Sequence, residues 1–158
     1  MKQLSFSRLD DISAQAVASP RFRMNANMHD DLGDSIQRLA IAMEPNTVIR
    51  PHRHEHTWEL LTALRGRFVV LLFSDDGFVT HRVVLGEDCA VQETPAGVLH
   101  GVLSLDEGGV IFEVKHGPYK VINASDFAPG YEVDDAQQGE ALNRWYAQAK
   151  VGDRLWGG

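Results

Sequence analysis

The chain has 158 residues, with 15 Lys and Arg against 22 Asp and Glu and a hydrophobic fraction of 44%. This length fits one ordinary domain whose core needs neither disulfides nor a structural metal, and a single cysteine, Cys89, cannot form an intrachain disulfide. The formal charge of −7 leaves no net attraction for phosphate backbones or anionic lipid, so we expect neither nucleic acid nor membrane as a partner.

The N-terminal part of the sequence changes from a helical to an extended pattern. Its first residues lack the apolar run of a secretory signal, and we therefore expect a cytoplasmic location. Residues 7–18 place their apolar side chains on one side, which predicts a short helix that ends before Pro20. Residues 21–29 alternate polar and apolar at every position, as in a strand with two unlike faces. A second strand is expected over 36–43, and a third extended stretch follows Pro45-Asn46.

The centre of the sequence predicts two hairpins. Residues 67–73 and 78–85 are β-rich runs, and the Asp-Gly pair between them favours a tight reversal. Residues 100–105 and 110–114 are separated by Asp106-Glu107-Gly108-Gly109 and predict a second hairpin. About eight short strands over residues 21–119 indicate a mainly β fold, a small antiparallel β-barrel or jelly roll.

The pattern becomes helical again after Gly117-Pro118. Residues 134–150 place Leu142 and Tyr146 on one apolar stripe, with Asp134 as the expected N-cap. A Ser/Gly-rich linker does not precede this segment. We therefore predict one domain over 1–158, with a barrel core at about 21–119 and a C-terminal helical appendage at about 120–158.

Three of the seven histidines lie within five residues, in the segment from Pro51 to Glu59. In a strand, His52 and His54 would project from one face about 7 Å apart, where two imidazoles can converge on one ion. Glu59 lies an odd number of residues further on, so it can join them only through a turn or bulge after His54. The same irregularity would turn His56 away, to the surface or behind the ligands.

Two motifs resemble those of the cupin superfamily, the RmlC-like proteins. The spacing His52-x-His54-x4-Glu59-x6-Gly66 resembles the first motif, and Pro95-x-Gly97-x2-His100 resembles the second. In that superfamily the motifs lie on adjacent strands of a small antiparallel barrel, where three histidines and one glutamate hold a divalent metal. The resemblance therefore implies one divalent ion, Fe, Ni, Mn or Zn, with four ligands: His52, His54, Glu59 and His100.

A narrower resemblance covers most of the chain. The segments 21–29, 37–38, 64–67 and 113–119, together with the histidine cluster, are similar to the bacterial WbuC-type cupin metalloproteins. Members of that group are named from gene clusters for O-antigen and related polysaccharides. The resemblance implies a sugar or nucleotide-sugar ligand in bacterial polysaccharide metabolism, and it implies no particular reaction.

Polar residues at two places are candidates for substrate binding. The amides and guanidiniums of segment 21–29 suit a pocket for hydroxyls, carboxylates or phosphates, and they suit a solvated strand face equally well. Near the end of the last long strand, an amine and a phenol could reach an anionic ligand in the barrel mouth or form an ordinary rim. The candidate substrate-binding residues are Arg23, Asn25, Asn27, Lys115 and Tyr119.

Three classes of function stay open at this point. The first is a metal-dependent enzyme, such as an isomerase or epimerase, acting on a sugar or nucleotide sugar. The second is a non-catalytic module that holds a carbohydrate-like or carboxylate ligand through its metal. The third is a metal-dependent dioxygenase or isomerase for another small molecule. The residue pattern identifies no catalytic residue, and it allows a homodimer.

Overall fold

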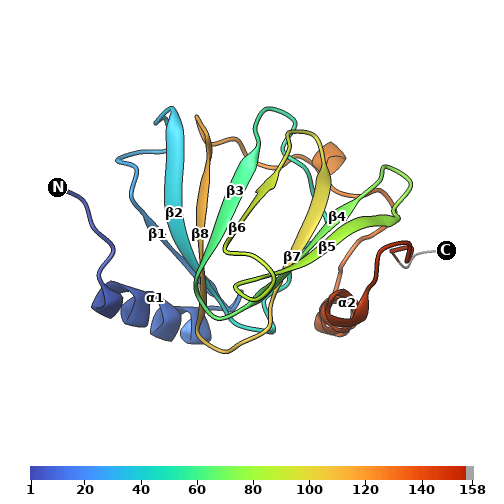
Figure 1. The fold of residues 1–158 in the computed structure, drawn as a ribbon, viewed down its shortest axis with the longest axis horizontal. Coiled ribbons are helices and arrows are strands. Elements are labelled where there is room, and N and C mark those ends of the chain that lie inside the picture. Colours follow the sequence, from blue (N-terminus) through green and yellow to red (C-terminus); the bar gives the residue numbers. More distant parts are fainter. Residues whose placement is uncertain (156–158) are drawn as a thin grey trace.

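Two antiparallel β-sheets and two flanking helices make up the fold in the computed structural model, which describes residues 1–155 (Figure 1). The elements are α1 (Phe6–Ala18), β1 (Arg23–Asn27), β2 (Ile36–Met43), β3 (Glu59–Arg65), β4 (Phe68–Phe73), β5 (Val79–Leu85), β6 (Val91–Thr94), β7 (Leu99–Ser104), β8 (Gly109–His116), the short 3-10 helix η1 (Ala124–Asp126) and α2 (Ala136–Gln148). The larger sheet has the order β1-β2-β8-β3-β6, and the smaller has the order β5-β4-β7. This is the predicted mainly β, jelly-roll class of fold.

The central core lies between the two sheets. Met43, Leu61 and Ile111 of the larger sheet pack against Phe68 and Val70 of the smaller one. Each of these side chains is at most 4% exposed. Because side chains alternate along a strand, the neighbours of these residues face outward and are free to contact the helices.

α1 covers the outer face of the larger sheet, as Figure 1 shows beneath β1 and β2. The side chain of Ser5 caps its first turn. Leu9 and Ile12 then pack on Ala40 and Ala42 of β2. These small alanines let α1 approach the sheet closely. Burial of its apolar face against the sheet then stabilises the predicted helix.

α2 covers the outer face of the smaller sheet, where Leu142 and Tyr146 pack among residues of β4 and β7. Its N-cap is Asp135 and not the predicted Asp134, because the Asp135 carboxylate accepts a hydrogen bond from the backbone of Gln138 at 2.8 Å. The helix is correspondingly shorter than the predicted range 134–150. The pattern of apolar residues locates a helix but does not fix its first and last turns.

The first predicted hairpin is confirmed and the second is wrong. β4 and β5 pair antiparallel across the turn at residues 74–77. β7 pairs with β4, however, whereas β8 pairs with β2 and β3, so residues 105–108 carry the chain from one sheet to the other. Consecutive strands of a jelly roll often change sheet, and glycine-rich turn residues fit such a crossing as well as a hairpin.

The extended stretch after Pro45-Asn46 does not form the predicted third strand. Within residues 44–58 only His52 makes β-bridges, one to His100 and one to Phe127. The predicted strand over 21–29 is also shorter, because Arg21 lies in a turn before β1. The irregular segment 44–58 thus carries the histidine motif outside the regular strands, whereas alternate residues of segment 21–29 still line one cavity.

The described part of the chain contains no helix that is both long and apolar enough to cross a membrane. The proposed domain boundaries and the cytoplasmic location stay predictions.

Candidate metal centre

Backbone contacts bring the two histidine motifs together. His52 and His100 exchange two hydrogen bonds, in which the N–H of His52 donates to the His100 carbonyl at 3.0 Å and the N–H of His100 donates back at 2.8 Å. The N–H of Gly97 donates to the carbonyl of His54 at 3.0 Å. Gly97 has a φ of 76°, a left-handed conformation that favours glycine over other residues. The turn before β7 is therefore joined directly to the first histidine motif.

The imidazoles of His52, His54 and His100 face one another. One ring nitrogen from each lies within 4.8 Å of the other two. The Nδ1 atoms of His52 and His100 lie 2.9 Å and 3.0 Å from the backbone carbonyls of Arg50 and Val98. Because only a protonated Nδ1 can donate to a carbonyl, the neutral rings carry their lone pair on Nε2, the form that binds a metal.

The Nε2 atom of His100 is buried and has no hydrogen-bond partner among residues 1–155. It lies 3.2 Å from Oε2 of Glu59, outside hydrogen-bonding geometry. An unpaired buried nitrogen costs free energy, and a divalent ion between the three rings would satisfy it. The donor set therefore fits a metal ion, whose identity three imidazoles do not determine.

Glu59 begins β3, and its buried carboxylate lies against two of the three histidines. Its Oε1 is 3.2 Å from Nε2 of His54, and its Oε2 is 3.2 Å from Nε2 of His100. A turn at residues 55–56 redirects the chain so that Glu59 reaches the site, as the sequence requires. His56 is exposed in that turn and lies outside the three-histidine cluster. The structure thus brings together all the predicted ligands, and ligation by Glu59 is a proposal.

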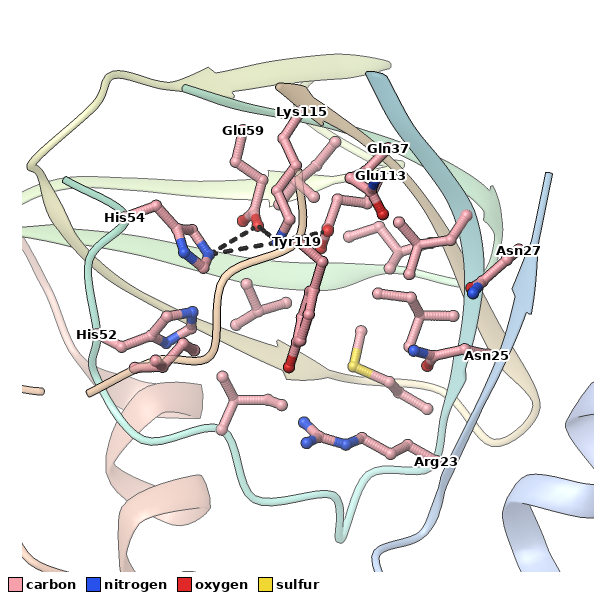
Figure 2. Close-up of a pocket in the computed structure, with 18 of the residues that line it drawn as sticks. Arg23, Asn25, Asn27, Gln37, His52, His54, Glu59, Glu113, Lys115 and Tyr119 are labelled. Carbon is pink, nitrogen blue, oxygen red and sulfur yellow. Dashed lines mark hydrogen bonds and ion pairs between the residues drawn. The ribbon is translucent and has the colours of Figure 1, made fainter. Parts of the chain in front are cut away.

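Lys115 lies beside the histidines and not on an outer rim. Its side chain is 15% exposed, and its Nζ lies 3.2 Å from Glu59 Oε1, 2.7 Å from Glu113 Oε1 and 3.5 Å from His54 Nε2 (Figure 2). Burial alone would lower the pKa of Lys115, but the carboxylates of Glu113 and Glu59 raise it above its ordinary value. The ammonium is therefore charged and shares one carboxylate with the candidate metal site.

Burial and neighbouring charges shift the pKa values of this centre. Burial lowers the pKa of His52 to about 3, which keeps the ring neutral over the physiological range. Burial would do the same to His100, but the Glu59 carboxylate raises its pKa above the ordinary value. Burial opposes the charge on Glu59, yet contacts with His100 and His54 hold its pKa well below the usual range. Burial and repulsion by Glu59 raise the pKa of Glu113 to about 7.

A cavity of about 600 Å³ opens beside the histidine cluster and is lined by His52 and His54. Its apolar lining comes from three residues of β2, from one residue each of β3, β7 and β8, and from irregular segments that include Val48, Ile49 and Phe127. Arg23, Asn25 and Asn27 line it from β1, and Lys115 and Tyr119 line it from β8 and the segment that follows (Figure 2). The five candidate substrate-binding residues therefore share one cavity, and their binding role is a proposal.

The sequence interpretation missed two cavity residues near the histidines. Glu113 lies in an apolar strand on the same face as Lys115, and this alternation could have identified a buried carboxylate. Arg50 precedes the histidine motif in an irregular segment, where no repeating period indicates which way a side chain faces.

α2 supports the segment that leads into the histidines. Nδ2 of Asn143 donates to the carbonyls of Pro45 and Thr47 at 3.1 and 3.0 Å, and the hydroxyl of Tyr146 donates to the carbonyl of Ile49 at 3.0 Å. A Cβ atom at position 101 would collide with the Tyr146 hydroxyl, so β7 needs glycine there. The outer helix thus fixes residues 45–49, just before His52.

Removal of the metal is expected to leave the protein folded. The apolar clusters between the sheets and under both helices are buried without the four candidate ligands. We expect an unchanged far-UV circular dichroism spectrum after chelation, with only the loss of thermal stability that follows from losing a bound ligand. Loss of the β-sheet signal on adding chelator would contradict this expectation.

Comparison with known proteins supports the fold and leaves the activity open. Residues 4–85 match the family model described as Domain of unknown function (DUF6016). No curated protein matches the sequence.

Three solved structures illustrate the likeness. TT1209 from Thermus thermophilus is 19% identical, with a TM-score of 0.55 over 73% of this chain and 97% of that one. An oxalate oxidase in complex with the substrate analogue glycolate is 14% identical, with a TM-score of 0.53 over 85% of this chain and 77% of its own. The Cnp3 cupin domain of Schizosaccharomyces pombe is 14% identical, with a TM-score of 0.48 over 60% and 64%. The first two share the jelly-roll fold of this chain, and identities this low show nothing further.

Proposed function

The chain belongs to the DUF6016 family, a domain of unknown function, and we propose from its site that it is a divalent-metal protein acting on a sugar or nucleotide sugar. The observation that carries this proposal is the approach of three imidazole nitrogens to within 4.8 Å of one another beside a cavity of about 600 Å³. His52, His54 and His100 would hold the ion, with Glu59 as fourth ligand. A divalent ion in such a set supplies Lewis acidity toward a ligand oxygen.

The chain's own residues support a polyhydroxylated ligand. Asn25 and Asn27 project from β1 at the cavity, and each amide can donate to and accept from neighbouring hydroxyls (Figure 2). The apolar lining from β2 offers a surface for the C–H face of a sugar ring. The similarity of segments 21–29 and 113–119 to WbuC-type cupins supports a nucleotide sugar in particular.

Replacing both Asn25 and Asn27 with alanine is expected to weaken ligand binding without changing metal content. The loss should be about 1–3 kcal/mol, because paired polar contacts in a partly desolvated site are removed. The measurement is calorimetric titration of a panel of nucleotide sugars into the metal-loaded protein and the double variant. Gln148→Ala, an exposed amide outside the cavity lining, is the control.

Two outcomes would count against the sugar proposal. Equal affinities of wild type and double variant for a confirmed ligand would assign the polar face of β1 to solvent. Binding of no sugar in the panel would contradict the proposed ligand class, whereas metal analysis would still test the three-histidine centre separately.

A further inference from the structure

The cavity beside the histidines carries positive charge that the protein leaves unpaired. Lys115 is balanced by Glu59 and Glu113. Arg23 and Arg50 also line the cavity, and within residues 1–155 neither forms an ion pair with a carboxylate. The whole chain has a formal charge of −7, so a local excess of guanidinium groups in this hollow is not a consequence of composition.

Arg23 and Arg50 enter this cavity from different parts of the fold. Arg23 extends from β1 toward the middle of the cavity, where Figure 2 shows its guanidinium below Tyr119. Arg50 comes from the segment before His52, and its guanidinium stacks on the ring of Phe127 at 4.3 Å from the ring centre. The Nε atom of Arg50 is buried and has no hydrogen-bond partner within residues 1–155. Stacking holds a guanidinium flat while leaving its N–H groups available.

His29 also lines this cavity and holds a buried ring nitrogen without a hydrogen-bond partner among residues 1–155. Its side chain lines the cavity although the residue is only 6% exposed. Nδ1 of His29 lies 3.0 Å from the backbone nitrogen of Arg38 and 3.1 Å from the Arg38 carbonyl oxygen, so it can accept from the first or donate to the second. The Nε2 atom of His29 is buried and has no partner among the described residues. A buried polar nitrogen without a partner is costly unless a ligand supplies one.

We propose that this cavity recognises an anionic group of the ligand, a phosphate or a carboxylate, through Arg23 and Arg50. Both guanidiniums offer donors and no acceptor, which matches an oxygen-rich anion. The ligand is then an organic anion whose other polar groups reach the histidines. The inference rests on the proposed function for the end of the ligand that reaches the metal. Recognition of the anionic group itself does not require a bound metal ion.

The test uses three probes that share one ring and differ in charge: glucose 1-phosphate, glucuronate and glucose. Each is titrated calorimetrically into the metal-loaded and the chelated full-length protein. We expect one or both anionic sugars to bind about tenfold or more tightly than glucose in both forms. We expect Arg23→Met and Arg50→Met each to remove this preference, while the metal content stays that of the wild type.

Two controls show whether the effect is specific to the proposed anion site. Arg144→Met removes an exposed guanidinium on α2 and should leave the preference intact. Arg50 lies close to His52, and its carbonyl contacts His52 Nδ1, so Arg23→Met on β1 tests the anion site without touching that segment. Circular dichroism confirms that each variant is folded.

The outcomes separate this inference from the proposed function. Equal binding of all three probes, no binding at millimolar concentration, or an undiminished preference in Arg23→Met would overturn the anion site. A preference for anionic sugars in a protein that holds no metal would support the anion site and contradict the metal function. If only glucose 1-phosphate or only glucuronate binds more tightly than glucose, the result identifies the anionic group as a phosphate or a carboxylate.

Discussion

Replacing His100 with alanine is expected to abolish stoichiometric metal binding. Its Nε2 is buried without a hydrogen-bond partner among residues 1–155, and the site would retain two imidazoles. Residues behind metal ligands already contribute about 10–100-fold to affinity, so loss of a ligand should cost about 100-fold or more. Elemental analysis of protein purified without chelators, followed by competition titration, measures the effect.

His81→Ala is the matched control for this experiment, because His81 is exposed on β5 outside the cluster. It should bind one ion per chain with wild-type affinity. His100 is 1% exposed, so urea unfolding must show that the alanine variant remains folded. Metal retained at full stoichiometry in a folded His100→Ala protein would refute the three-histidine centre.

Metal affinity should also fall as the pH is lowered through the raised pKa of His100. A protonated His100 must release its proton before Nε2 can bind an ion. At pH values below the pKa of His100, each ion that binds therefore displaces a proton. His52, with a pKa of about 3, adds no such dependence near neutral pH. Competition titrations at a series of pH values, with calorimetry in two buffers, measure the protons released.

Replacing Lys115 with methionine is expected to cause a large loss of unfolding free energy in the metal-free protein. The change leaves Glu59 and Glu113 buried without their ammonium partner. Removing one member of a buried ion pair typically costs about 3–5 kcal/mol, because the remaining charge is uncompensated. Urea unfolding of the chelated proteins measures the change, and Lys120→Met, at an exposed lysine, is the control.

The loss of unfolding free energy caused by Lys115→Met should grow as the pH rises. In the wild type the folded pKa of Glu113 is about 7 against an ordinary value of 4.5, so the folded state binds more protons between these values. The contribution of Glu113 to stability therefore declines as the pH rises through this window. Without Lys115 the decline should be steeper, and Glu113→Gln in the same variant should restore part of the stability. Unchanged unfolding of Lys115→Met at neutral pH would contradict the burial of this pair.

The histidine cluster was predictable because motif spacing constrains the chain locally. His52 and His54 are close in sequence, and Glu59 can reach them only through a turn, which the structure has at residues 55–56. The second hairpin was not predictable in the same way. Residues 105–108 suit a reversal, and only the long-range pairing of β8 with β2 and β3 decides that the chain crosses to the other sheet.

The rest of the cavity depends on which way irregular segments face. Asn25 and Asn27 follow the alternation of β1, so they could be assigned to one face from the sequence. Arg50 lies in a segment without regular structure, and its direction follows from stacking on Phe127, which is distant in the sequence. Such contacts between remote segments arise from packing of the whole fold and leave no periodic signal.

The hydrogen bonds from Asn143 and Tyr146 to residues 45–49 would couple α2 energetically to an ion bound at the three histidines, although α2 lies beyond the 4–85 range of the family match. An ion that binds only when His52 is in place also favours every contact that keeps it there. Amide hydrogens of residues 136–148 should therefore exchange more slowly once metal is bound. By the same reciprocity, any event that loosens this helix from the smaller sheet would weaken binding of the ion.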